Sequence, residues 1–260
     1  MKLKFWFKTA LYLLIPGGYG YPRYLRRYYD SVYVHERDKH AVRKKHHGTE
    51  GWKEQKNGNV AYRDYNDYAE YVTHQQQKFE EILRIEGGFS NKVIVSYRLK
   101  FYRRFKLLHQ LIPRTACIVC AGARQGTEVE VLRDLGFSNA YGIDLNPGPE
   151  NPFVRWGDFM HMDNKTSSVD LVYTNCVDHV FNLNEFFAEH ARVIKPDGYV
   201  LYDLSLDVKS SRGSFETVCW ESEEDIFLIM LRYFKMIVRL ENEEGWKWIL
   251  LRGKKLENRE

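Results

Sequence analysis

The strongest signal for the fold of this chain is the segment Ala116-Cys-Ile-Val-Cys-Ala-Gly-Ala-Arg-Gln-Gly-Thr-Glu-Val-Glu130. Its apolar run breaks at Gly122 and resumes with helical spacing beyond Gly126, which predicts a buried strand, a glycine turn and the start of a helix. A parallel α/β sheet usually begins in this way. The first backbone N–H groups of a helix have no intrahelical partner, and glycine lets a ligand approach closely. The turn is therefore a candidate ligand site.

Length and cysteine content limit the class of protein. A chain of 260 residues has room for one α/β domain and an extension. Its 4 cysteines are too few for a disulfide framework, which indicates a reducing, cytoplasmic compartment. Cys117 and Cys120 form a C-x-x-C, but side chains three positions apart on a strand point to opposite faces. We interpret both as small buried apolar residues and not as zinc ligands.

The N-terminal segment is basic, since residues 1–47 carry most of the surplus positive charge, which favours an anionic neighbour. Residues 1–15 are amphipathic and fall short of the about 20 apolar residues that a spanning helix needs. Two interpretations stay open for them: packing on the protein's own body, which is the commoner case, or peripheral contact with a membrane. The basic run 43–47 has no aromatic platform beside it, so no nucleic-acid partner is expected.

The rest of the chain alternates between strand and helix patterns. This alternation favours a parallel sheet with helices on both faces, and a short polar turn near the end predicts an antiparallel hairpin. We divide the chain into an N-terminal helical or irregular extension, 1–112, and a core, 113–260. Residues 16–60 are expected to be irregular with short helical pieces, and 205–220 to form a loop. Helices are predicted at 65–84 (capped by Asp64), 92–110, 127–135, 183–193 and 223–233 (capped by Ser222), and later strands at 140–144, 153–156, 169–174, 199–203, 236–240 and 246–251.

Polar residues follow the first four strands of this core. Gly122 to Gly126 ends the first strand, and Asp144, Asp158 and Asn175 end the next three. Ligands of open α/β sheets bind outside the carboxyl ends of the strands, so these residues should line one crevice. Asp144, roughly 20 residues past the glycine turn, is placed to bind a ribose diol. Arg124 occupies the position of the second glycine of a dinucleotide fingerprint, so the fit to NAD is poor, and no Walker Lys-Ser/Thr follows the turn.

Residues 115–204 resemble a class I S-adenosylmethionine-dependent methyltransferase of the small-molecule type. The resemblance implies a Rossmann-like, doubly wound, mostly parallel seven-stranded sheet with a C-terminal antiparallel hairpin, preceded here by the helical extension. It also implies S-adenosylmethionine as the cofactor. The matching segments are the methionine-binding loop 119–126, the ribose-binding strand end 142–144, the adenine-contacting turn 157–159, the fourth strand 169–175 that faces the methyl group, and the helix-turn-strand segment 193–199.

The resemblance also implies which residues hold the cofactor. This chain has Cys120 where the family usually has an acid, and Arg124 where it commonly has glycine, so Glu128 is a candidate substitute for contacting the methionine ammonium. Arg124 is interpreted either as a contact to the cofactor carboxylate or as a surface turn residue. For Asp144 and Asp158 the alternative is a role in turns or caps. The expected cofactor-binding residues are Gly122, Ala123, Arg124, Gly126, Asp144, Leu145, Asp158, Phe159 and Asn175.

Methyl transfer to oxygen requires a group that removes a proton. His179 is the first candidate for this base and Asp178 a weaker one, together with Asp203 and Asp207, while a purely structural role for His179 is the alternative. Spacing assembles no carboxylate cluster, so no metal is expected.

We expect transfer to a small-molecule, sugar or lipid-linked acceptor, at oxygen, with the N-terminal hundred residues and loop 205–220 selecting it. A catalytically silent adenosyl-binding scaffold is the alternative, and a nicotinamide-dependent oxidoreductase is less favoured. Nothing in the sequence indicates an oligomeric state.

Overall fold

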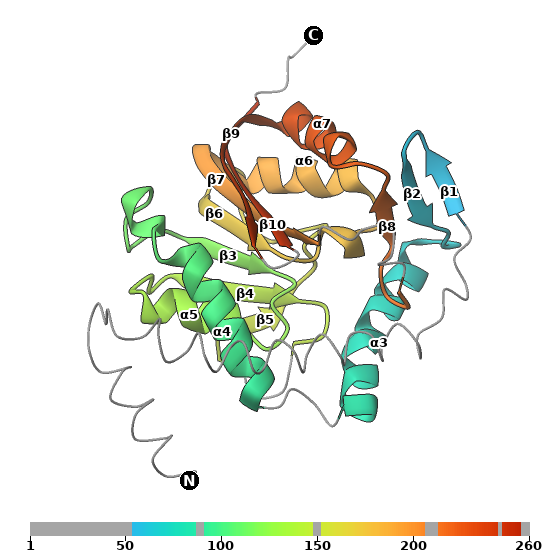
Figure 1. Cartoon of the computed structure of the whole chain (residues 1–260), viewed down its shortest axis with the longest axis horizontal. Helices are drawn as coiled ribbons and strands as arrows, with labels where there is room; N and C mark the ends of the chain where they lie inside the picture. The colour runs from blue at the N-terminus through green and yellow to red at the C-terminus, as the bar shows by residue number, and fades with distance from the viewer. Residues whose placement is uncertain (1–53, 87–90, 148–151, 206–212, 244–245, 256–260) are drawn as a thin grey trace.

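The structure is a computed structural model that describes residues 54–86, 91–147, 152–205, 213–243 and 246–255 (Figure 1). The expectations for segments 1–15 and 43–47, and for Asp207, lie outside these residues. None of the described helices is both long and apolar enough to cross a membrane.

A seven-stranded sheet in the order β5-β4-β3-β6-β7-β10-β9 forms the centre of the molecule. The first five of these strands are parallel, and β10 runs antiparallel to both β7 and β9. This confirms the predicted fold class, including the terminal hairpin. The strands are β3 (Ile118–Ala121), β4 (Ala140–Asp144), β5 (Val154–Trp156), β6 (Val169–Thr174), β7 (Ile194–Ser205), β9 (Phe234–Glu243) and β10 (Trp246–Lys254).

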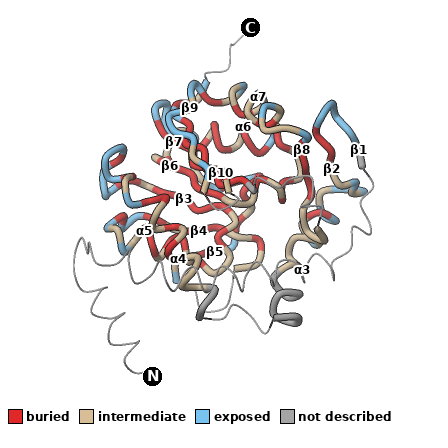
Figure 2. The backbone as a smooth tube through the Cα atoms, in the orientation of Figure 1, coloured by how far each residue is buried: buried red, intermediate tan, exposed pale blue. Residues whose placement is uncertain are grey.

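Helices cover both faces of this sheet, and each face has its own apolar core (Figures 1 and 2). Helices α4 (Asn91–Phe105) and α5 (Thr127–Asp134) lie on one face, and α6 (Leu183–Val193) and α7 (Glu223–Tyr233) on the other. Every residue of β3 is buried because both of its faces are covered, which explains its unbroken apolar sequence. Cys117 contacts one core and Cys120 belongs to the other, as their spacing predicted.

Local capping signals fix most helix starts. Asn182 accepts hydrogen bonds from the backbone N–H groups of Asn184 and Glu185 to begin α6, and Ser222 with Asp225 forms the capping box of α7. Helix α3 spans Tyr68–Glu86. The prediction that Asp64 caps it is wrong, because the chain first turns through residues 65–67 and Asp67 Oδ1 accepts the N–H of Glu70.

Two expectations fail because long-range pairing overrides local pattern. Residues expected to be irregular or looped form a second sheet, in the order β1 (Glu54–Asn57), β2 (Val60–Arg63) and β8 (Val218–Trp220). β2 gains its second partner about 160 residues along the chain, so neither segment reveals it alone. The predicted helix 92–110 is also interrupted: α4 ends at Phe105, and a 3₁₀ turn, η1 (Leu108–Gln110), follows.

The extension and the core are joined at several places, so the boundary at residue 112 stays an interpretation of the sequence. β2 pairs with β8, and α4 packs on α5. Arg104 of α4 donates from Nε and from an NH2 group to the buried carboxylate of Asp203 in β7, at 2.7 and 3.1 Å. This ion pair holds Asp203 beneath α4, so the carboxylate is not available as a base.

Candidate active site

The order of strands reverses between β3 and β6, which are neighbours in the sheet. The chain leaves β3 through the glycine loop 122–126, and leaves β6 through residues 175–179, where Val177–His179 form the 3₁₀ turn η2. Such a switch point is where open α/β sheets bind their ligands. Helix α3 approaches the same edge, because the Tyr71 hydroxyl donates to the backbone oxygen of His179 at 2.9 Å.

The glycine loop is fixed by its backbone. The N–H groups of Gly122 and Ala123 both donate to the carbonyl oxygen of Ile143 in β4, at 2.9 and 3.0 Å. Gly122 has φ +74° and Gly126, which precedes α5, has φ +70°. A Cβ on Gly122 would lie 2.8 Å from Sγ of Cys176, so both backbone conformation and space require glycine there.

Asp144 ends β4 and connects it to the glycine loop. Its Oδ2 accepts the backbone N–H of Arg124 at 2.9 Å, and its Oδ1 accepts that of Asn146 at 2.8 Å. Arg124 itself has φ +43°, in the left-handed region. Asp144 thus has the turn-stabilising role named as an alternative, and this role also fixes its carboxylate beside the loop. The adjacent Leu145 is buried, and its carbonyl accepts the side-chain amide of Gln76 in α3.

Asp158 lies after β5, in the turn expected to contact adenine. Its Oδ1 accepts the N–H of Met160 at 2.8 Å, and its Oδ2 accepts the hydroxyl of Tyr68 at 2.5 Å. Tyr68 belongs to α3, so the extension reaches this turn as well. The ring of the buried Phe159 lies 3.6 Å from where a Cβ on Gly122 would stand. The adenine turn and the glycine loop are therefore in contact.

Cys176 joins the turn after β6 to the same cluster. Its Sγ lies 3.4 Å from Oδ1 of Asn175 and 3.7 Å from the carbonyl oxygen of Gly122. The fold thus brings the sequence-predicted residues of all four strand ends to one edge of the sheet. Their individual binding roles stay predictions.

His179 is buried, and its hydrogen bonds define its tautomer. Nδ1 lies 2.8 Å from the carbonyl oxygen of Phe215, which can only accept, so Nδ1 carries the proton. Nε2 then accepts a hydrogen bond from Nζ of Lys78, at 2.6 Å. Burial, and next the charge of Lys78, lower the pKa of His179 to about 3. Asp178 lies close by, with Oδ1 at 3.6 Å from Nε2 of His179, and burial raises its pKa.

Lys78 and Glu216 belong to this cluster but were missed from the sequence. A ring nitrogen of His179 and one carboxylate oxygen each of Asp178 and Glu216 lie within 4.8 Å of one another. Nζ of Lys78 lies beside them, in contact with Nε2 of His179. Lys78 follows the buried Tyr71 by seven residues, or two helical turns, so a lysine on the same face of α3 was an available signal. No local signal marks Glu216, since the position of its segment depends on the pairing of β8.

Glu128 in the first turn of α5 is also buried. Burial, and next the proximity of Asp144, raise its pKa to about 8, while Arg124 opposes the shift. Burial, and next the charge of Glu128, raise the pKa of Cys120, the residue that replaces the usual acid. The sequence-based expectation that Glu128 contacts the methionine ammonium stays a prediction, and the position of Glu128 between the first strand and Asp144 is compatible with it.

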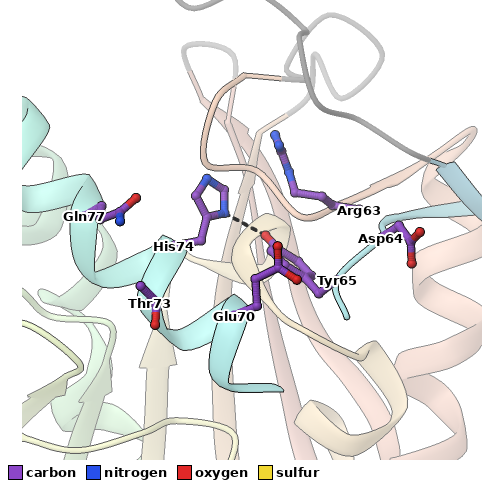
Figure 3. A pocket seen from close by; sticks show the side chains of 7 residues that line it. All are labelled: Arg63, Asp64, Tyr65, Glu70, Thr73, His74 and Gln77. Carbon is purple, nitrogen blue, oxygen red and sulfur yellow. Dashed lines mark hydrogen bonds between the residues drawn. The ribbon is translucent and has the colours of Figure 1, made fainter. Parts of the chain in front are cut away.

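A surface hollow of about 520 Å³ is lined by residues of α3 and of the segment 63–65 before it (Figure 3). Nδ1 of His74 and the hydroxyl of Tyr65 are 2.8 Å apart across it. The His74 ring stacks on Phe215, the residue whose carbonyl accepts from His179. Phe215 thus contacts both His74, which lines the hollow, and His179 of the cluster. The hollow is lined by Arg63, Asp64, Tyr65, Glu70, Thr73, His74 and Gln77.

Comparison with known proteins finds one family match by sequence and several solved structures with the same fold. Residues 119–202 match the family model described as a methyltransferase domain. This segment runs from β3 into β7 and contains the four strand ends described above. No curated protein matches the chain by sequence.

Solved structures share the fold at low sequence identity. A Burkholderia thailandensis 1,6-didemethyltoxoflavin-N1-methyltransferase, solved with S-adenosylhomocysteine, is 15% identical with a TM-score of 0.59, covering 78% of this chain and 99% of its own. PH0226 from Pyrococcus horikoshii is 18% identical with a TM-score of 0.54, covering 68% and 100%. A Streptomyces coelicolor geranyl diphosphate C-methyltransferase, also solved with S-adenosylhomocysteine, is 12% identical with a TM-score of 0.53, covering 73% and 100%.

Residues 119–202 match the methyltransferase-domain family, and the sheet has the Rossmann-like strand order expected of a class I S-adenosylmethionine-dependent methyltransferase. The residues present fit this cofactor. The glycine loop leaves no side chain at Gly122, and Asp144 and Asp158 present carboxylates at the neighbouring strand ends. Gly122 to Gly126 would hold the methionine part, Asp144 the ribose and Asp158 the adenine.

Proposed function

We propose that this protein transfers a methyl group from S-adenosylmethionine to a hydroxyl group of a small-molecule, sugar or lipid-linked acceptor. The observation that carries the proposal is the meeting, at one switch point, of the glycine loop, two strand-end carboxylates and a Lys78–His179–Asp178 cluster. The first two features are suited to the cofactor, and the third to removing a proton.

Methyl transfer asks little of the protein beyond alignment. The bound cofactor supplies a methyl group already activated on a sulfonium sulfur. The protein has to orient the acceptor, exclude water and accept a proton. Helix α3 is suited to excluding water, because hydrogen bonds from Tyr68, Tyr71 and Gln76 attach it across the strand ends.

The choice of oxygen as the acceptor atom rests on the cluster after β6. The names of similar solved structures include an N-methyltransferase and a C-methyltransferase, so the fold alone is compatible with other acceptor atoms. A hydroxyl must lose its proton as it attacks, and basic groups at the strand end suit that requirement. Aromatic, cationic and amide side chains around the hollow beside α3 are suited to a hydroxyl-rich acceptor, such as a sugar, extending to the surface.

Ligand binding and turnover test the proposal. We expect S-adenosylmethionine and S-adenosylhomocysteine to raise the melting temperature of the full chain, and NAD to leave it unchanged. A panel of sugars, phenols and prenyl-linked sugars is then assayed for release of S-adenosylhomocysteine. Stabilisation by NAD alone would refute the methyltransferase function.

A second function is favoured by one observation: Cys120 stands where an acid is usual, and Cys120 is fully buried. This substitution suits a catalytically silent adenosyl-binding scaffold. Binding of both adenosyl ligands without turnover of amine, carbon or hydroxyl acceptors would support the scaffold instead of the enzyme.

Peripheral membrane contact through residues 1–15 is a separate part of the proposal, supported by their amphipathic sequence. Liposome flotation of the full chain is compared with that of a chain lacking these residues. Equal and negligible flotation of the two would remove the membrane contact, while the methyltransferase proposal would stand.

A further inference from the structure

Lys78 is a partly buried lysine of the extension, and its side-chain amine lies at the switch point of the core. It lies in α3, and its Nζ is 2.6 Å from Nε2 of His179 in the turn after β6. That turn contacts the glycine loop through Cys176 and Gly122. Lys78 therefore stands beside the two loops between which the ligand of such a sheet binds.

The partner of Lys78 is a neutral imidazole. Because Nδ1 of His179 donates to the carbonyl of Phe215, its Nε2 has a lone pair directed at Nζ. A neutral acceptor fixes the position of the amine without adding a negative charge that would hold its proton. The hydroxyl of Tyr71 fixes the backbone of His179 in turn. The pair is thus positioned from both α3 and the segment at Phe215.

Charged groups of both signs face Lys78 from every element packed against it. Arg124 of the glycine loop and the burial of Lys78 disfavour its ammonium form, whereas Asp178 and Glu216 favour it, as does Cys176 when ionised. Burial is the largest of these effects, and the pKa of Lys78 is lowered from that of an ordinary lysine. Desolvation and a neighbouring cation both favour the neutral amine, which is the form of a lysine that can accept a proton.

We propose that Lys78 is the proton acceptor for the attacking hydroxyl group and that His179 is its positioning residue. This inference rests on the proposed methyltransferase function. It reassigns the role expected for His179, whose imidazole has its Nε2 occupied by Lys78 and its Nδ1 occupied by the carbonyl of Phe215.

The step balances without a further reactant. The acceptor oxygen forms a bond to the methyl carbon while the carbon–sulfur bond breaks, and its electron pair stays on sulfur as the thioether of S-adenosylhomocysteine. The hydroxyl proton moves to the free amine of Lys78, giving the ammonium, which later releases it to water. No oxidant, reductant or metal is required.

The charge of the cofactor provides a direct test. S-adenosylmethionine carries a sulfonium charge that S-adenosylhomocysteine lacks. A cation bound near Lys78 should lower the pKa of its ammonium further. One added charge at a distance of roughly 12 Å, with an effective dielectric constant of roughly 20, corresponds to about one pH unit.

The measurement is an NMR titration of the lysine Nζ groups in the full chain, free and with each of the two ligands. The Lys78 signal is assigned by its loss in Lys78→Arg. We expect its midpoint below 10.5 in the free protein, lower by about one unit with S-adenosylmethionine than with S-adenosylhomocysteine. A His179→Gln variant, checked for folding by circular dichroism, should move this midpoint because it removes the aromatic acceptor that positions the amine.

Lys100 is the matched control. It is also a lysine with a lowered pKa, about 8, but it belongs to α4 and its Nζ lies beside Asp203 and Trp246. Its signal should not differ between the two ligands. A Lys78 midpoint at the ordinary lysine value, or one equally indifferent to the sulfonium, would overturn the inference. Failure of both ligands to bind would instead refute the proposed function, which calorimetry detects separately.

Discussion

Nζ of Lys78, in the helix of the N-terminal extension, lies 2.6 Å from Nε2 of His179, in the turn that follows the fourth strand of the core. The two residues are 101 positions apart in the chain. Their contact means that the extension contributes to the candidate active site. Two further hydrogen bonds from the same helix, Tyr68 to Asp158 and Gln76 to Leu145, support this. A core without α3 would lack the group that we propose as proton acceptor.

Replacing Asp144 by alanine should weaken binding of S-adenosylhomocysteine by at least about tenfold. The substitution removes the proposed ribose ligand and also the acceptor of the Arg124 and Asn146 N–H groups, each hydrogen bond to a charged group being worth about 1.5–3 kcal/mol. Isothermal titration calorimetry measures the effect. Asp197→Ala, at an exposed carboxylate near the start of β7, is the control and should bind normally. Unchanged affinity in Asp144→Ala would show that the ribose site lies elsewhere.

A Gly122→Ala substitution should lower stability by about 1–3 kcal/mol and abolish ligand binding. The new Cβ would stand 2.8 Å from Sγ of Cys176, and alanine is strained at φ +74°. Urea unfolding followed by fluorescence gives the change in free energy. The double variant with Cys176→Ala should recover part of the stability, because it removes the clash while leaving the backbone strain. Full recovery would mean that the backbone is not strained.

Tyr68→Phe should reduce the affinity for S-adenosylhomocysteine by roughly two- to tenfold, because one neutral-to-charged hydrogen bond that orients Asp158 is lost. Burial and the neighbouring carboxylate raise the pKa of the Tyr68 hydroxyl, so it remains a donor over the whole working range of pH. Calorimetry at pH 7 checks this, with Tyr65→Phe as a control that leaves Asp158 untouched. Tighter binding would show that Tyr68 competes with the ligand for Asp158.

Acid should destabilise the fold through His190. This buried imidazole contacts the hydroxyl of Tyr202, and burial lowers its pKa to about 3, from 6.5 in an unfolded chain. Between these values the unfolded chain binds a proton that the folded protein does not. The free energy of unfolding therefore falls as pH drops from 6.5 towards 3, by about 1.4 kcal/mol per pH unit. In His190→Leu, urea unfolding should show a correspondingly smaller slope, and an unchanged slope would assign the acid sensitivity elsewhere.

Alkaline pH should have the opposite effect through Lys100. Its ammonium lies 3.3 Å from Oδ2 of Asp203 and over the ring of Trp246, and burial lowers its pKa to about 8. Between pH 8 and 10.5 the unfolded chain retains a proton that the folded protein has lost, so stability rises with pH, by up to about 3 kcal/mol in total. Lys100→Met should remove this rise in urea unfolding measured at successive pH values. A rise that persists in the variant would exclude Lys100 as its source.

Local sequence patterns predict the order of strands and helices in the core, the glycine loop and the acids at the strand ends. These are local features: the buried run Ile118–Ala121, the caps Asn182 and Ser222, and the left-handed glycines act within a few residues of themselves. Parallel topology then forces Asp144 and Asp158 to one edge.

Which other groups meet at that edge depends on long-range packing. The pairing of β2 with β8 and the contacts of Lys78, Glu216 and Tyr68 join segments up to about 160 residues apart, which no periodicity records. The pKa of His179 likewise depends on burial and on Lys78. Desolvation and charge proximity are properties of the folded state, so the role of a titratable residue follows from packing, whereas its presence follows from sequence.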